Sequence, residues 1–199
     1  ISGRVAAGNP AVPDYRELLA GHYASLGALQ KDVGRLDEAM AFVQKAIEIR
    51  RGLATDHPDV REYRFYLAGS YNNLANLQRD AGKHHEAICG YQKAIEISGK
   101  LAVESPRDVR YRVFLAIHYL GLGRAQEETG TLKQAITSFQ QSLAIRKELA
   151  SENPQVIDYQ YALASSYTDL GSLERSLGRT SEGLANCRRA IDIMERLVA

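Results

Sequence analysis

The sequence predicts an all-α fold, a solenoid of four antiparallel helix pairs, from three observations. The chain of 199 residues repeats itself with a fixed period of 48 residues. Within each repeat, apolar residues recur every three or four positions in two separate stretches, the spacing of a helix with one apolar face. One glycine divides the two stretches in every repeat, at Gly34, Gly82, Gly130 and Gly178. A regular period of this length is typical of stacked units rather than of a globule around one central pocket.

Prolines and tyrosines keep the same register as the glycines. The prolines stand at Pro10, Pro58, Pro106 and Pro154. Eight of the eleven tyrosines occupy two repeat positions, Tyr15, Tyr63, Tyr111 and Tyr159 in one and Tyr23, Tyr71, Tyr119 and Tyr167 in the other. Because no insertion breaks the register, we expect every copy to stack on the next in the same way, and we assign the tyrosines to packing.

The second repeat shows why the first half of each copy should form a helix. The apolar residues of this half are Tyr63, Leu67, Tyr71, Leu74 and Leu77. Pro58 suits a first helical turn, where its missing N–H costs little, and Asp59 lies near the positive end of the helix dipole. Gly82 should end the helix, since glycine adopts the left-handed backbone conformation that closes a helix C-terminus.

A second helix is predicted directly after Gly82. Its apolar stripe consists of Ala87, Tyr91, Ala94, Ile95, Ile97 and Leu101. Each helix should hold roughly 20 residues and measure about 30 Å in length. Gly52 and the Ser98–Gly99 pair fall inside the second helices of the first two repeats. Because glycine costs about 1 kcal/mol relative to alanine in a helix, we expect a kink or early fraying there.

The register divides the chain into an N-terminal segment and one array. We expect residues 1–8 to be a linker or tail and residues 9–199 to form a single solenoid. The repeats span residues 9–56, 57–104, 105–152 and 153–199. The chain begins without a methionine and ends on an apolar stretch without a polar capping helix. We therefore expect it to be part of a longer protein.

Composition argues against several classes of function. With 25 basic and 24 acidic residues the formal net charge is +1, which offers no patch for nucleic acid. No run is apolar enough to span a bilayer, so we expect no membrane insertion. Cys89 and Cys187 occupy different repeat positions, which favours buried free thiols over a disulfide. We therefore expect a reducing compartment, the cytoplasm, although a cysteine-poor periplasmic protein would have a similar sequence. His85 and Cys89 lie four residues apart, but zinc needs three or four ligands, so we expect no metal and no cofactor.

The repeat unit resembles that of the tetratricopeptide repeat family. The family pattern appears in the second repeat at Tyr71, Leu74, Ala75, Gly82, Ala87 and Ala94. The long period and the strings His57-Pro58-Asp59-Val60 and Asn72-Asn73-Leu74-Ala75 are similar to the kinesin-light-chain-like variety found in bacterial multidomain proteins. One departure is a polar column at a first-helix position that is usually apolar in the family, Gln30, Gln78, Gln126 and Glu174.

The resemblance implies a right-handed superhelix whose first helices line a concave face and hold an extended peptide. Carried over position by position, the groove residues would be Lys31, Asn72, Asn76, Arg79, Arg124, Thr168, Ser172 and Arg175, with Ala24, Ala28, Leu120 and Glu127. Asn72 and Asn76 lie one turn apart, and each amide both donates and accepts hydrogen bonds. Arg79, Arg124 and Arg175 have the planar fork that pairs with a carboxylate. The alternative is that these polar residues only face solvent.

One further column combines histidine and serine, at His22, Ser70, His118 and Ser166. Such a column could line the groove or pair with a neighbouring helix. No nucleophile with a base and an orienting acid can be identified in it, so we expect no catalytic residue and no enzyme activity.

Three functions are compatible with these observations. The leading hypothesis is a non-catalytic scaffold for protein–protein interaction that binds an extended peptide or a partner helix. The alternative is a regulatory or sensory repeat arm of a larger bacterial signalling enzyme, such as a serine/threonine kinase. A third is end-to-end self-association of arrays through their open apolar ends.

Overall fold

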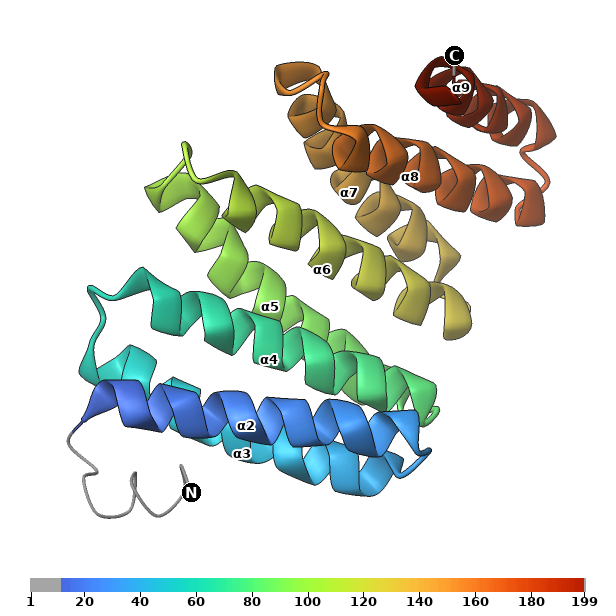
Figure 1. Cartoon of the computed structure of the whole chain (residues 1–199). Coiled ribbons are helices and arrows are strands. Elements are labelled where there is room, and N and C mark those ends of the chain that lie inside the picture. Colours follow the sequence, from blue (N-terminus) through green and yellow to red (C-terminus); the bar gives the residue numbers. More distant parts are fainter. Residues whose placement is uncertain (1–11, 199) are drawn as a thin grey trace. The chain divides into compact units, whose positions relative to one another are not determined.

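The computed structural model describes residues 12–198, and in this part of the chain the fold is all-α. Its eight helices are shown in Figure 1: α2 (Pro13–Asp32), α3 (Leu36–Asp56), α4 (Arg61–Asp80), α5 (His84–Glu104), α6 (Val109–Glu128), α7 (Leu132–Glu152), α8 (Ile157–Ser176) and α9 (Thr180–Val198). They form four antiparallel pairs, and each pair coincides with one 48-residue repeat. The predicted all-α fold of four helix pairs is confirmed. The predicted linker, residues 1–8, lies outside the described residues.

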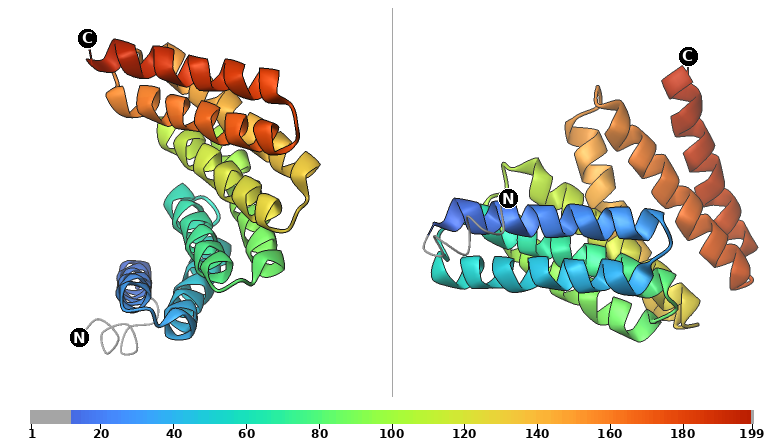
Figure 2. Two further views of the ribbon diagram at one scale, coloured as in Figure 1. Left: turned by 90° about the vertical axis from the view of Figure 1, so that its right-hand side faces the viewer. Right: turned by 60° about the horizontal axis from the view of Figure 1, so that its bottom comes forward.

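The chain divides into two compact units, Ile1–Glu104 and Ser105–Ala199, and the boundary falls between the second and the third repeat. Each unit therefore contains two whole repeats. Within each unit, the second helix of one pair packs against the first helix of the next, α3 on α4 and α7 on α8. Figure 2 shows the same helix pairs from two further sides. That residues 9–199 form a single solenoid stays a prediction.

The four turn glycines end the first helix of each pair as the sequence predicts. Gly34, Gly82, Gly130 and Gly178 have φ angles of 79°, 74°, 74° and 76°, in the left-handed region. The expectation that Pro58 opens a helix is wrong, because α4 begins at Arg61. Pro58 lies in the preceding turn, where the amide of Val60 donates to the carbonyl oxygen of His57 at 3.1 Å.

The predicted fraying at Gly52 and Gly99 does not occur. Helices α3 and α5 run unbroken through these glycines to Asp56 and Glu104. A Cβ atom at Gly52 would lie 2.7 Å from Nη2 of Arg16, and Nη1 of the same arginine binds the Asp56 carboxylate at 3.1 Å. The glycine thus makes room for a side chain of α2 that ties the two helices together.

Small residues let the two helices of each pair approach closely. The column on the first helices is Gly27, Ala75, Gly123 and Gly171, and all four residues are buried. A Cβ atom added to Gly123 would lie 2.5 Å from ring carbons of Phe139, and one added to Gly27 would lie 2.8 Å from Cγ2 of Val43. Distances this short leave no room for a side chain, so the packing of these pairs requires glycine at both positions.

The polar column of the first helices is buried in the second unit and is hydrogen-bonded there. Gln126 is 6% exposed and accepts a hydrogen bond from Oγ of Ser138 at 2.7 Å. Glu174 is 8% exposed and accepts one from Nδ2 of Asn186, also at 2.7 Å. Ser138 and Asn186 share a repeat position, so two repeats satisfy the same buried position with different polar pairs.

One ion pair recurs in three of the helix pairs. It joins a first-helix arginine to an acid 40 residues later, near the end of the second helix: Arg16–Asp56, Arg64–Glu104 and Arg112–Glu152. The last two are bidentate, with distances from 2.6 to 2.8 Å. Because the acids are exposed to solvent, these ion pairs contribute little to stability.

The tyrosines pack in two different ways. Tyr63 and Tyr111 of the first column are buried, whereas Tyr15 is 43% exposed. The second column lies half-buried beneath a basic side chain in three repeats, in the pairs Tyr23–Lys45, Tyr71–Lys93 and Tyr167–Arg189, with 5.4, 5.4 and 5.7 Å from the cation to the ring centroid. The assignment of the tyrosines to packing is confirmed for the buried Tyr63 and Tyr111 and for the three tyrosines beneath basic side chains.

Candidate functional site

In the first unit a small pocket lies between the first helices α2 and α4, where the sequence predicts a groove. Its volume is about 160 Å³. Its lining consists of Ala24, Gly27, Ala28, Lys31, Val43, Asn73, Asn76 and Leu77. Four residues predicted for this unit are among them: Ala24, Ala28, Lys31 and Asn76. Asn72 and Arg79, also predicted, do not line the pocket.

The pocket faces a different stripe of α4 from the one that the family register indicates. Asn73, Asn76 and Leu77 follow one another at spacings of three and one, so they share one helical face. Sequence reasoning missed Asn73 and Leu77. The i, i+3, i+4 spacing around Asn76 is a signal that could have found them.

The Asn76 amide is oriented by the second helix of its own pair. The hydroxyl of Tyr91, a residue with 0% exposure, donates to Oδ1 of Asn76 at 2.6 Å. This bond occupies the carbonyl side of the amide and leaves its NH₂ group for a further acceptor. The amide is therefore held as a donor at the pocket.

Lys31 is held at the edge of the same pocket by an acid from α4. Nζ of Lys31 lies 2.8 Å from Oδ2 of Asp80, and Nη2 of Arg79 lies 3.3 Å from Oδ1. Partial burial acts to raise the pKa of Asp80, but the hydrogen bonds and charges of Lys31 and Arg79 outweigh it and lower this pKa. Lys31 and Arg79, two of the predicted groove cations, thus share the carboxylate of Asp80.

In the second unit the predicted groove residues are more exposed. Arg124 lies at the limit of contact with Asp169, with 3.5 Å between Nη2 and Oδ1. Ser172 and Arg175 are exposed on α8. Thr168 is exposed as well, and its Oγ1 donates to the carbonyl oxygen of Ala164 in the same helix at 3.2 Å.

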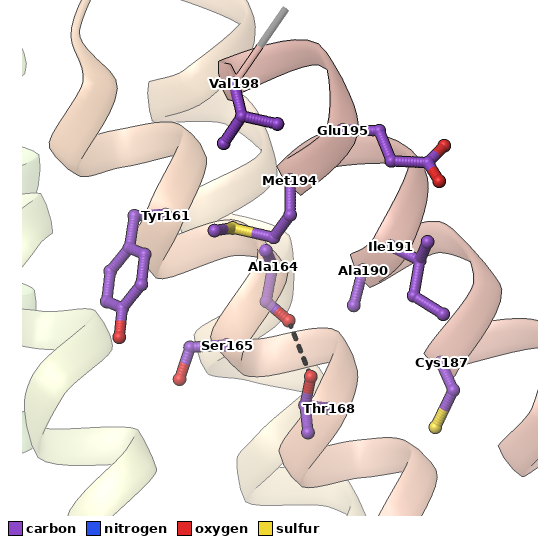
Figure 3. A pocket seen from close by; sticks show the side chains of 10 residues that line it. All are labelled: Tyr161, Ala164, Ser165, Thr168, Cys187, Ala190, Ile191, Met194, Glu195 and Val198. Carbon is purple, nitrogen blue, oxygen red and sulfur yellow. Dashed lines mark hydrogen bonds between the residues drawn. The ribbon is translucent and has the colours of Figure 1, made fainter.

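A larger and mainly apolar pocket of about 660 Å³ lies on α8 and α9 (Figure 3). It is lined by Tyr161, Ala164, Ser165, Thr168, Cys187, Ala190, Ile191, Met194, Glu195 and Val198. Tyr161, Ile191 and Val198 are 61%, 55% and 81% exposed. Exposed apolar patches are a common feature of protein–protein interaction sites.

Two buried arginines at the same repeat position connect the repeats within each unit. Arg50 and Arg146 are each 9% exposed. Nη1 of Arg50 donates to Oγ of Ser70 at 2.7 Å, and Nη1 of Arg146 donates to Oγ of Ser166 at 2.8 Å. Both serines belong to the histidine–serine column of the sequence. Ser70 and Ser166 thus pair with a side chain of a neighbouring helix, which is one of the two roles predicted for that column.

The cysteines differ from the sequence expectation. Cys89 is an exposed free thiol on α5 and Cys187 is a half-buried one, so the prediction of buried thiols is wrong for Cys89. Cys89 lies on the solvent-facing side of α5, outside the stripe of buried residues. Within residues 12–198 no group of three or more His, Cys, Asp or Glu side chains could hold a metal ion. In the same range no helix is long and apolar enough to cross a membrane.

Two family models, both described as tetratricopeptide repeat, match the sequence. One matches residues 19–59 and 163–198, and the other matches residues 68–101. Together these ranges cover more than half of the chain, in the first, second and fourth repeats. No protein of curated function matches the sequence. The matching families do not include an enzyme family.

Several solved structures have the same fold. BtubC (BKLC) from P. vanneervenii is 23% identical over 94% of this chain and 66% of its own, with a TM-score of 0.74. A kinesin-light-chain-type protein of Podosopora anserina with nearly identical TPR-like repeats is 19% identical over 98% of this chain and 92% of its own, with a TM-score of 0.65. The apo form of RapI is 16% identical over 97% of this chain but 47% of its own, with a TM-score of 0.72. The helix pairs are thus similar to those of kinesin-light-chain-like repeat domains. The chain belongs to the tetratricopeptide repeat family.

Proposed function

We propose that the chain is a non-catalytic protein-interaction module that binds an extended peptide or a partner helix along its first helices. Tetratricopeptide repeat domains generally bind protein partners. The observation that carries the proposal is the pocket between α2 and α4, which combines an apolar wall with polar groups held in place. A volume of about 160 Å³ suits a single side chain of a bound peptide.

Three side chains of the pocket supply the contacts that a peptide needs. The NH₂ group of Asn76 donates to a peptide carbonyl, because Tyr91 already occupies the other side of the amide. Asn73 lies one turn away and adds a second amide with both a donor and an acceptor. Lys31, anchored by Asp80, presents a positive charge at the edge. This set favours backbone recognition with a preference for a nearby acid on the peptide.

In the second unit, the exposed residues Arg124, Ser172 and Arg175 supply further contacts of the same kind. Arg124 is held by Asp169 only at 3.5 Å, so a ligand carboxylate competes with that weak contact. The groove set predicted from the sequence, Asn72 included, stays part of the proposal. Within the first unit, Asn72 and Arg79 would contact a bound peptide beside the α2–α4 pocket.

The test starts from peptides selected out of a random library on the immobilised chain. The affinity of a selected peptide is then compared by calorimetry between the native chain and the Asn73→Ala/Asn76→Ala variant. Loss of two hydrogen bonds of about 1 kcal/mol each predicts binding weaker by about 10- to 30-fold. Gln44→Ala, at an exposed position of α3, is the matched control and should leave the affinity unchanged. Equal affinity of both variants would refute the pocket as the binding site.

A second candidate function, end-to-end self-association, is favoured by the apolar pocket on α8 and α9. A second copy that covers Tyr161, Ile191 and Val198 would bury much of their exposed apolar surface. Light scattering across a range of protein concentrations checks this. A Tyr161→Glu variant that stays monomeric while the native chain associates supports it, and a native chain that is monomeric at high concentration contradicts it.

A regulatory or sensory arm of a larger bacterial signalling enzyme remains the alternative at the level of the whole protein. The same groove would then hold a segment or partner of that enzyme. The coding sequence on either side of this chain decides between the two, since a kinase domain there favours the arm.

A further inference from the structure

In the first unit each of the three guanidinium nitrogens of the buried Arg50 donates a hydrogen bond. Glu17 accepts from Nε of Arg50 at 3.1 and 3.2 Å and from Nη2 at 2.6 Å. Nη1 donates to Ser70, and the ring of Tyr66 lies 5.4 Å from Cζ. The fork and one face of the guanidinium are therefore covered by side chains of α2 and α4. This is the arrangement that a buried arginine requires.

The second unit has the arginine but neither the acid nor the ring. Ninety-six residues further along, Val113 stands at the position of Glu17 and Ala162 at that of Tyr66. Nη1 of Arg146 donates to Oγ of Ser166 at 2.8 Å and to the carbonyl oxygen of Ala162 at 2.9 Å. Within residues 12–198, Arg146 makes no ion pair, and its Nε and Nη2 atoms make no hydrogen bond. These are the two atoms that bind Glu17 in the first unit.

A cavity lies next to this guanidinium. It has a volume of about 250 Å³, and its lining consists of Val113, Ala116, Ile117, Arg146, Leu149, Asp158, Tyr159 and Ala162. We call it the Arg146 pocket. The loss of a carboxylate at position 113 and of a ring at position 162 leaves room for both kinds of group. Apart from Arg146 and Asp158, the walls consist of apolar side chains and the ring of Tyr159.

The positive charge of Arg146 is destabilised by its burial, since no acid pairs with it within residues 12–198. Burial is the largest effect on Arg146 and lowers its pKa, and the neighbouring Arg124 lowers it further. Asp169 acts in the opposite direction without forming an ion pair. A buried cation whose fork meets no acid is stabilised by any anion that reaches it.

We propose that the Arg146 pocket binds a single carboxylate attached to an apolar group about the size of an aromatic side chain. The carboxylate takes the place on Arg146 that Glu17 has on Arg50, and the apolar group takes the place of the Tyr66 ring. Asp158, exposed in the lining and not paired with Arg146, disfavours a second negative charge, which selects a monoanion over a phosphate. This proposal does not rest on the groove between α2 and α4, since all of its residues lie in the second unit.

Four small probes test the chemistry and distinguish the source of the carboxylate. N-acetyl-tyrosine carries it as a chain terminus, and its amide is the neutral control. The blocked dipeptide N-acetyl-Glu-Tyr-amide carries it on a side chain, and the Gln-Tyr analogue is the neutral control. Binding is followed by NMR at the Nε–Hε resonance of Arg146. We expect at least one acid to shift this resonance and to bind at least about 10-fold more tightly than its neutral partner, because its charged hydrogen bonds are lost in the amide. The acid that binds more tightly shows whether the natural carboxylate is a chain terminus or a side chain.

Two variants of the chain supply the controls. Arg146→Met removes the fork but keeps the volume, and the fourth repeat already has methionine there, at Met194. It should abolish binding of the acids. Val113→Glu restores the acid of the first unit, and it should block the probes and raise the melting temperature. Acids that bind Arg146→Met as well as the native chain, neutral probes that bind equally well, or the absence of any shift at millimolar acid would each overturn the proposal.

Discussion

Replacing Gly123 by alanine tests the close packing of α6 on α7. The new Cβ atom would lie 2.5 Å from Cδ1 and Cε1 of Phe139 and 3.2 Å from Cγ. Carbon atoms pack favourably at about 3.5–4.0 Å, so the ring or the helix must move by roughly 1 Å. The ring of Phe139 is 2% exposed, so it cannot move out into solvent without disturbing its neighbours. Overpacking of this kind costs about 1–3 kcal/mol, against a gain of about 1 kcal/mol in helix propensity. We therefore expect a net loss of up to about 2 kcal/mol.

The same substitution without the clash is the control. At Gly69, inside α4, an added Cβ atom has nothing within 4 Å, so Gly69→Ala should stabilise the chain by up to about 1 kcal/mol. Within the second unit, Gly123→Ala placed on a Phe139→Ala background should also become stabilising, because the ring is gone. Urea unfolding followed by circular dichroism gives the free energies. A Gly123→Ala variant as stable as Gly69→Ala, or one whose effect is unchanged by the loss of the ring, would refute the packing argument.

Three further predictions concern buried polar groups and one pH effect. Arg50→Met should cost about 2–4 kcal/mol, because it leaves the half-buried carboxylate of Glu17 unpaired, whereas Arg146→Met should cost about 1–2 kcal/mol; urea unfolding of both variants measures the difference. Asn186→Ala should cost about 1–3 kcal/mol by leaving the buried Glu174 unpaired. The double variant Glu174→Gln/Asn186→Ser, which copies the Gln126–Ser138 pair of the third repeat, should be nearly neutral in the same assay. Asp80→Asn should reduce stability at neutral pH by less than about 1 kcal/mol. Because the pKa of Asp80 is lowered in the folded chain, its contribution is present above the ordinary carboxyl pKa and is lost as the pH falls through the folded value, so unfolding in strong acid should show no difference.

The fold could be predicted almost entirely from the register of the sequence. The column of turn glycines located the ends of the first helices, and the φ angle of 79° at Gly34 confirms the reason given for them. A period that never shifts leaves only one way to divide the chain into pairs. The length of each helix followed from the distance between one turn and the next.

Local details depended on contacts that one sequence does not reveal. Gly52 looked like a helix breaker because the position of Arg16 above it was unknown. Pro58 looked like a helix start, but the turn closed by His57 and Val60 holds it outside α4. The prediction for Cys89 was wrong because this residue lies beside the buried stripe of α5 and not within it. For Gly52 a tertiary contact thus outweighed the local helix propensity, whereas for Pro58 a local turn decided where the helix begins.

The candidate sites were predictable to different degrees. The family register led to Lys31 and Asn76, but not to Asn73, since the rotation of α4 relative to α2 decides which neighbour faces the pocket. The exchange of Glu17 for Val113 is visible in the sequence. That this exchange leaves a buried guanidinium beside a cavity required the coordinates, because Ala162 creates the space from another helix.

The most direct test of the central claim is a map of where a selected peptide binds. Amide chemical shifts of the full chain are recorded during a titration with a peptide from the library selection. The proposed function predicts that the largest changes lie at Ala24, Ala28, Asn73 and Asn76, on the facing sides of α2 and α4. Changes confined to the exposed sides of the second helices, such as around Gln44 on α3, would contradict it.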